Sequence, residues 1–153
     1  MPPDVLDRLR RNSQIGLDRE GRWTLDGRAV EHPRVQRLFH QGVRPAADGG
    51  GFTLHVGAQW CFIQHLEETA YFIDKARVEG QSVLLTLADG SMETLDLTTL
   101  STRGPEDVYC RLPERGVARF LRDALAALAP WLDEEEEQFG LRLGDRFYPI
   151  RAE

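Results

Sequence analysis

The stretch WCFIQHLEETAYFI, residues 60–73, decides the fold of this chain. Its aromatic and aliphatic run is typical of a strand with little solvent on either face. In an extended chain His65 and Glu67 lie on one face and Glu68 lies on the other, because strand side chains alternate. The stretch therefore predicts a sheet. It leaves open whether His65 and Glu67 form a chemical site or the polar edge of that sheet.

The spacing His65-x-Glu67 resembles that of a non-haem iron site, which needs a further histidine from a later strand. The chain's four histidines are His32, His40, His55 and His65, so no later strand supplies one. We therefore expect no metal and no cofactor, and we favour a polar sheet edge. Glu67 and Glu68 cannot act together on a sugar, because neighbouring strand residues face opposite sides.

The composition is that of an ordered globular protein with 153 residues, 41% of them hydrophobic and 29% charged. No segment approaches the roughly 20 apolar residues needed to span a bilayer, and the N-terminus has no apolar signal region, so we expect a cytoplasmic protein without membrane insertion. Cys61 and Cys110 fall in apolar runs and are expected to be reduced and structural.

The net charge of −6 is unevenly distributed along the chain. Residues 1–44 carry nine arginines and six acids, whereas residues 45–153 carry ten basic residues and nineteen acids. An acidic protein repels the phosphates of nucleic acids, so we expect no DNA or RNA partner.

Periodicity and turn signals divide the chain into three parts. Turns are predicted at Asp26-Gly27 and, in a short final hairpin, at Gly144-Asp145, and residues 70–97 are predicted to form a three-strand antiparallel meander. Residues 1–14 are predicted to form a helical arm, and residues 15–66 a β-rich lobe whose helix, 33–41, begins at a proline and ends before Gly42. Residues 67–153 are predicted to form a β-meander lobe with a helix at 116–132, where apolar residues recur at three- and four-residue steps. The expected fold is α+β, with mostly antiparallel strands and a packed helix in each lobe. Similar acidic, Gly-containing turns before aromatic-led strands suggest a possible duplication.

The acidic run DEEEEQ, residues 133–138, lacks the spacing of a calcium loop. It is interpreted as a solvated helix end or a linker, with no role assigned.

One group of residues could form a binding site for a small ligand. Arginine forks beside an aromatic ring are what an anionic, planar ligand such as a nucleotide would use. The alternative interpretation is that these arginines are scattered over the surface. The residues predicted to converge in a crevice between the lobes are Arg34, Arg37, His65, Glu67, Tyr109, Arg111 and Arg119.

Several pieces of the sequence together resemble a known family in their order and spacing, from about Ile15 to Ile150. They are GRWTLDGRAV (21–30), PRVQRLF (33–39), GFTL (51–54), LEETAY (66–71) and GDRFYPI (144–150). Tyr109 and the pair Ala118-Arg119 are similar to a strand tyrosine and a helix-opening Ala-Arg of that family. The family is the bacterial domain-of-unknown-function family number 1285.

The resemblance implies an α+β fold of two related β-rich lobes, the second superficially like a pleckstrin-homology domain. It also implies a nucleotide-type ligand at the lobe interface in a signalling context, and no enzyme activity. Our first hypothesis is thus a non-catalytic module that binds a small anionic ligand. The alternatives are a protein-interaction domain without a ligand, and a small enzyme that uses His65 and Glu67.

Overall fold

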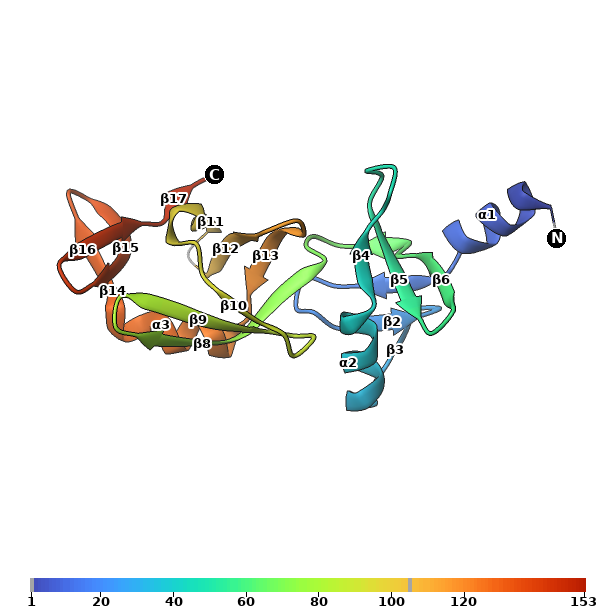
Figure 1. Ribbon diagram of the computed structural model, residues 1–153, viewed down its shortest axis with the longest axis horizontal. Helices are drawn as coiled ribbons and strands as arrows, with labels where there is room; N and C mark the ends of the chain where they lie inside the picture. Colours follow the sequence, from blue (N-terminus) through green and yellow to red (C-terminus); the bar gives the residue numbers. More distant parts are fainter. Residues whose placement is uncertain (1, 105) are drawn as a thin grey trace. The chain divides into compact units, whose positions relative to one another are not determined.

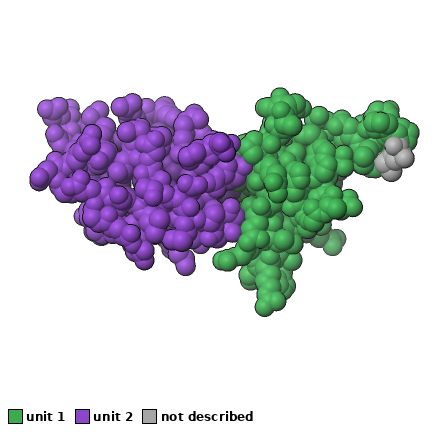
Figure 2. Space-filling view, viewed as in Figure 1, with its two compact units in different colours: residues 1–70 green, residues 71–153 purple. Residues whose placement is uncertain are grey.

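A computed structural model describes residues 2–104 and 106–153 and has a mixed α+β fold (Figure 1). The chain divides into two compact units, residues 1–70 and 71–153 (Figure 2), so the division falls four residues after the predicted lobe boundary. Met1 of the predicted arm and Pro105 of the predicted second lobe lie outside the described residues. Within the described ranges, no helix is both long enough and apolar enough to cross a membrane.

The first unit contains a four-stranded sheet in the order β3-β2-β1-β7. The predicted turn at Asp26-Gly27 is confirmed: both residues have positive φ, as a tight hairpin turn requires. β1 and β7 run parallel, which joins the LEETAY segment to the N-terminal meander. No residue between 65 and 70 is helical, as expected from the sequence. The bounds are β1 Ile15–Leu17, β2 Trp23–Leu25, β3 Arg28–Ala29 and β7 His65–Leu66.

A second, three-stranded sheet of the first unit has the order β4-β5-β6 and carries the helices α1 and α2 beside it (Figure 1). The helix predicted at 33–41 is confirmed, and it begins with Pro33 and ends before Gly42. The sequence did not predict the short strand β4, because its extended conformation depends on pairing with β5 and not on a local sequence pattern. The bounds are α1 Pro3–Arg11, α2 Pro33–Gln41, β4 Val43–Pro45, β5 Phe52–Val56 and β6 Gln59–Phe62.

Trp23 is the central core residue of the first unit and is fully buried. Its ring meets Phe39 of α2 edge-on, with 5.4 Å between ring centroids, and His40 at 5.5 Å. Edge-to-face contacts of this kind add to the free energy gained from burial. Trp23 thus docks α2 onto the four-stranded sheet.

The second unit is built on a seven-stranded sheet in the order β10-β9-β8-β13-β12-β11-β17. The predicted three-strand meander β8-β9-β10 is confirmed, and α3 packs against β8 (Figure 1). Ile73, Leu85 and Ala118 are fully buried at the centre of this sheet. The bounds are β8 Tyr71–Glu79, β9 Ser82–Leu87, β10 Met92–Thr94, β11 Ser101–Gly104, β12 Asp107–Leu112, β13 Gly116–Phe120, α3 Arg122–Leu128 and β17 Arg151–Ala152.

The helix predicted at 116–132 is wrong in its extent. Residues 116–120 form β13, which pairs with β8 on one side and with β12 on the other. A central strand that is buried on both faces is apolar at most positions, so Val117 and Phe120 of β13 satisfied helical spacing without forming a helix. Only residues 122–128 are α-helical, and a 3-10 turn, Ala129–Trp131, follows. Accordingly, Ala118 and Arg119 do not open a helix.

The acidic run is a strand and a turn, so its interpretation as a helix end or linker is also wrong. β14, Leu132–Glu135, pairs with β15, Gln138–Leu143. Arg142 of β15 stabilises this strand pairing, because it forms ion pairs with Asp133 at 2.7 Å and with Glu135 at 2.6 Å on the neighbouring strand. The predicted final hairpin at Gly144-Asp145 is confirmed by the pairing of β15 with β16, Arg146–Pro149.

We expect the turn between β14 and β15 to be improved by replacing its two central residues. Glu136 and Glu137 both have positive φ, at 52° and 68°, a geometry that favours Asn-Gly. The double variant Glu136→Asn/Glu137→Gly should raise the free energy of unfolding by about 1–2 kcal/mol in urea titrations. The control Glu136→Gln/Glu137→Gln removes the same charges and keeps the strained backbone. An equal gain in the control would show that charge repulsion, and not backbone strain, limits this turn.

The change Gly42→Ala provides a second test, because local and tertiary arguments predict opposite effects on the free energy of unfolding. The φ of Gly42, −92°, suits any residue, so chain entropy alone predicts that Gly42→Ala stabilises by about 0.5 kcal/mol. However, a Cβ at Gly42 would collide with the backbone carbonyl oxygen of His55. We expect Gly42→Ala to lower the free energy of unfolding by about 2 kcal/mol. The matched change Gly104→Ala meets only an ordinary contact and should be nearly neutral. Stabilisation by Gly42→Ala would contradict the close approach.

Candidate functional site

Two of the residues predicted for the ligand site, Arg34 and Arg37, lie on the exposed side of α2. Neither lines either of the two pockets described below. The structure therefore places them where the alternative interpretation of scattered surface arginines put them.

In the second unit, Tyr109 and Arg119 are neighbours across β12 and β13. The buried guanidinium of Arg119 donates hydrogen bonds from Nη1 to the Tyr109 hydroxyl at 3.1 Å and to Asp107 Oδ1 at 2.8 Å. Burial is the largest single influence on the pKa of Arg119 and lowers it. The interactions with Asp107 and Tyr109 together outweigh burial, so the pKa is raised overall. The exposed Arg111 uses its backbone N–H to bind the Thr99 hydroxyl at 3.0 Å. The Tyr109–Arg119 pair thus belongs to the interior of the unit.

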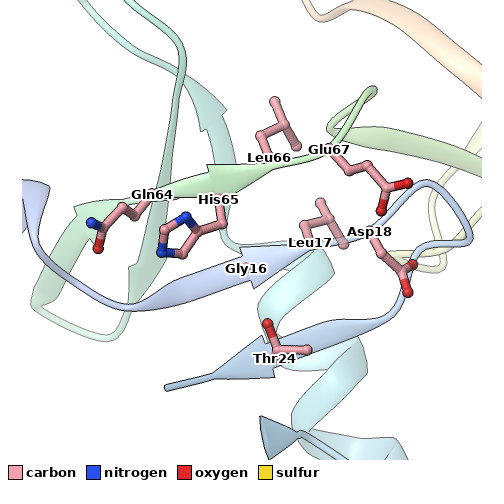
Figure 3. Close-up of a pocket in the computed structure, with 8 residues that line it drawn as sticks. All are labelled: Gly16, Leu17, Asp18, Thr24, Gln64, His65, Leu66 and Glu67. Atoms are coloured by element: carbon pink, nitrogen blue, oxygen red, sulfur yellow. The ribbon is translucent and has the colours of Figure 1, made fainter. Parts of the chain in front are cut away.

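His65 and Glu67 both line an open depression of about 500 Å³ on the first unit (Figure 3). We call it the His65 depression. Figure 3 shows the imidazole of His65 projecting from β7 toward β1, with Gln64 at one end of the depression and Glu67 and Asp18 at the other. Its lining residues are Gly16, Leu17, Asp18, Thr24, Gln64, His65, Leu66 and Glu67.

The charged side chains that line the His65 depression are both acidic. Asp18 accepts hydrogen bonds from the N–H groups of Glu20 and Arg22, and its other oxygen pairs with Arg22 Nε at 3.0 Å. Among the described residues, no three His, Cys, Asp or Glu side chains are grouped so that they could hold a metal ion. Arg22 offsets the charge of Asp18, but Glu67 stays negative and no arginine or lysine lines the depression, so an anionic ligand requires another site.

A second pocket of about 470 Å³ lies on the first unit between α1 and the sheet β4-β5-β6. We call it the arginine pocket. The sheet register places His55 opposite Trp60 and Thr53 opposite Phe62 and Arg44. Because facing residues share a side, these five side chains lie on one face, while Val43 and Leu54 lie in the core on the other. The lining residues are Asp7, Arg11, Arg44, Pro45, Ala46, Ala47, Asp48, Thr53, His55, Trp60 and Phe62.

Arginines of α1 cover the aromatic rings of this face. The guanidinium of Arg10 lies 3.9 Å from the ring centroid of Trp60, and that of Arg11 lies 4.3 Å from that of Phe62. Both distances are within the range of cation–π attraction. The His55 ring is stacked beside Trp60, with 5.9 Å between centroids and 13° between planes. The pocket thus combines aromatic surface with positive charge.

The charge of the arginine pocket is not fully balanced by its own acids. Arg11 pairs with Asp7 at 2.9 Å and approaches Asp48 at 3.9 Å. Arg44, in contrast, forms no ion pair with any described residue. The pKa of His55 is lowered from its ordinary value of 6.5, mainly because the imidazole is partly buried and also because the positive charge of Arg44 is close. The lowered pKa favours the neutral imidazole at pH 7, and its Nε2 lies 3.0 Å from the Thr53 hydroxyl.

None of the lining residues of the arginine pocket was selected from the sequence. The signal that could have found them is the alternation of Thr53 and His55 on one strand and Trp60 and Phe62 on the next, which puts polar and aromatic side chains on one face. Only the pairing register, however, shows that this face is not the core.

The two cysteines are free, as the sequence analysis expected. Burial raises the pKa of Cys110 to about 12, with Asp96 adding to the effect. Burial also raises the pKa of Cys61, which lies on β6. Neither thiol is activated as a nucleophile.

The chain has a fold like that of DUF1285 proteins, as the sequence resemblance suggested. A DUF1285 family protein from Silicibacter pomeroyi DSS-3 superposes with a TM-score of 0.69 and 19% identity, over 90% of this chain and 79% of that one. One from Shewanella baltica OS155 gives a TM-score of 0.60 and 15% identity, over 78% and 93% of the two chains. No protein-family model and no curated protein sequence matches the chain.

The lowered pKa of His55 predicts how stability depends on pH. As the pH falls through about 6.5, the unfolded chain binds a proton at His55 more readily than the folded chain does, so the free energy of unfolding falls as the pH drops through this range. We expect His55→Gln to reduce the loss of stability between pH 7 and pH 5 in urea titrations. The comparison variant is His65→Gln, a change of the same kind at an exposed position. An unchanged pH dependence in His55→Gln would contradict the role of this imidazole.

Proposed function

We propose that the chain is a non-catalytic, cytoplasmic binding module of the kind used in signalling, and that it binds a small, planar, anionic ligand of the nucleotide class. We place this ligand in the arginine pocket of the first unit. The observation that carries the proposal is the face of β5 and β6 that turns His55, Trp60 and Phe62 away from the core and toward arginines.

A planar ring suits the walls of the arginine pocket. Aromatic side chains that point away from their own core indicate a surface made for contact, because most surface-facing strand positions are polar. Trp60, Phe62 and the small residues Ala46 and Ala47 supply the apolar part of the lining. The volume of about 470 Å³ also falls in the range of small-molecule sites.

An anionic group suits the rim of the same pocket. Three guanidinium groups, those of Arg10, Arg11 and Arg44, lie in or beside it, against the two carboxylates of Asp7 and Asp48. Both carboxylates face Arg11, which leaves Arg44 available for a phosphate or carboxylate. A planar guanidinium can bind such groups through two parallel hydrogen bonds.

The lining residues supply charge, hydrogen bonds and aromatic surface, but they do not supply an accessible nucleophile. The only hydroxyl among them, that of Thr53, is buried, and it lies 3.0 Å from His55 Nε2 and 3.4 Å from the Arg44 carbonyl oxygen. These properties support binding rather than turnover.

Adenosine 5′-monophosphate tests the proposal, with adenosine as the uncharged probe of the same ring. We expect AMP at about 100 times its dissociation constant to add about 2.7 kcal/mol to the free energy of unfolding, and adenosine to add much less. Arg44→Ala should weaken AMP binding about tenfold or more in calorimetric titrations, because it removes a charged hydrogen-bond donor.

The matched control is Arg34→Ala, which removes the same charge from an exposed arginine outside the pocket. This variant should change the affinity for AMP by no more than about twofold, because salt screens the interaction between the ligand and a charge outside the pocket. The proposal fails if a panel of purine and pyrimidine nucleotides produces no stabilisation, or if the two arginine variants weaken binding equally.

A further inference from the structure

We propose that the His65 depression is a second, independent binding site, and that it takes a small uncharged polyhydroxylated molecule of the polyol or monosaccharide class. This inference does not rest on the proposed function, because it uses different residues and a ligand of different charge. It is carried by a row of three residues across three strands, Thr24, Gly16 and His65.

The row brings the Thr24 hydroxyl and the His65 side chain together at its central glycine, and we call this part of the depression the notch. Gly16 pairs with Thr24 on β2 and with His65 on β7, so the three residues share one face of the sheet. A Cβ at Gly16 would collide with the Thr24 hydroxyl oxygen and lie 3.5 Å from the His65 Cβ. The Thr24 hydroxyl therefore occupies the space that a larger residue at position 16 would fill, and the His65 side chain lies on the other side of the glycine (Figure 3).

The walls of this notch hold hydrogen-bonding capacity that the described residues do not use. The Thr24 hydroxyl and the His65 ring make no hydrogen bond to any described residue. Gln64 accepts a bond from the Gln14 N–H at 2.9 Å through Oε1, which leaves its amide N–H groups. Glu67 accepts a bond from the Arg19 N–H at 3.3 Å through one oxygen, which leaves the other.

These groups select a ligand that both donates and accepts hydrogen bonds. Glu67 can only accept, the Gln64 amide nitrogen can only donate, and the Thr24 hydroxyl and the His65 ring can do either. An anion is disfavoured, because Glu67 is negative and no arginine or lysine lines the depression. An ammonium ion can only donate, so it would leave the Gln64 amide without a partner. Hydroxyl groups satisfy all four side chains.

The test uses the full chain, labelled with ¹⁵N and ¹³C, and NMR titrations with glucose, myo-inositol and ribose. We expect saturable shifts of the Gly16 amide and of the His65 ring signals with at least one of them, at dissociation constants on the order of millimolar. The ring signals of His40 and His55, which do not line the depression, should stay unchanged.

Two variants separate this site from non-specific effects of sugars. Thr24→Val removes a hydroxyl and Glu67→Gln replaces a charged acceptor by a neutral amide, and each should weaken binding about tenfold. Glu68→Gln removes the same charge one residue further on, outside the depression, and should leave the affinity unchanged. The proposal is overturned if no polyol produces saturable shifts at Gly16 and His65, if putrescine binds more tightly than the polyols, or if Glu67→Gln and Glu68→Gln behave alike.

Discussion

The close approach of Gly42 to the backbone of His55 is the contact on which the arrangement of the first unit depends. The His55 N–H donates to the Gly42 carbonyl at 2.8 Å, and no larger residue could stand at this distance from the His55 carbonyl. The contact joins the end of α2 to the last part of β5 and so opposes a shift of the strand along its neighbours. With this register His55 stands opposite Trp60, and the face they share turns away from the core. A shift of one residue would exchange the two faces and bury the aromatic wall of the arginine pocket.

The first unit thus carries two concave sites of opposite character. The arginine pocket is built on β4, β5 and β6 and presents guanidinium groups, whereas the His65 depression is built on β1, β2 and β7 and presents carboxylates. The uneven charge of the sequence fits this division only in part. The nine arginines of residues 1–44 include Arg10, Arg11 and Arg44, but Arg34 and Arg37 stay on the exposed surface of α2.

Much of the fold could be predicted from local signals, because those signals also agree with the tertiary structure. Pro33 and Gly42 bound α2 as expected, and the turns at Asp26-Gly27 and Gly144-Asp145 connect strands as expected. The prediction failed at β13, where pairing on both edges overrides a helical pattern, and at β14, where Arg142 holds two acids across the hairpin. The arginine pocket was harder to predict from the sequence, because it depends on which residues of β5 and β6 face each other. His65 and Glu67 do share a depression, yet its charge suits another ligand than the anion first expected.

The pKa of the His55 imidazole, measured by NMR with and without AMP, tests the central claim most directly. In the free protein, burial and Arg44 hold this pKa below its ordinary value. A phosphate bound beside Arg44 would offset that positive charge and stabilise the imidazolium, so our account expects the pKa of His55 to rise when AMP binds. If AMP binds and leaves the pKa of His55 unchanged, the anion lies elsewhere and the arginine pocket is not its site.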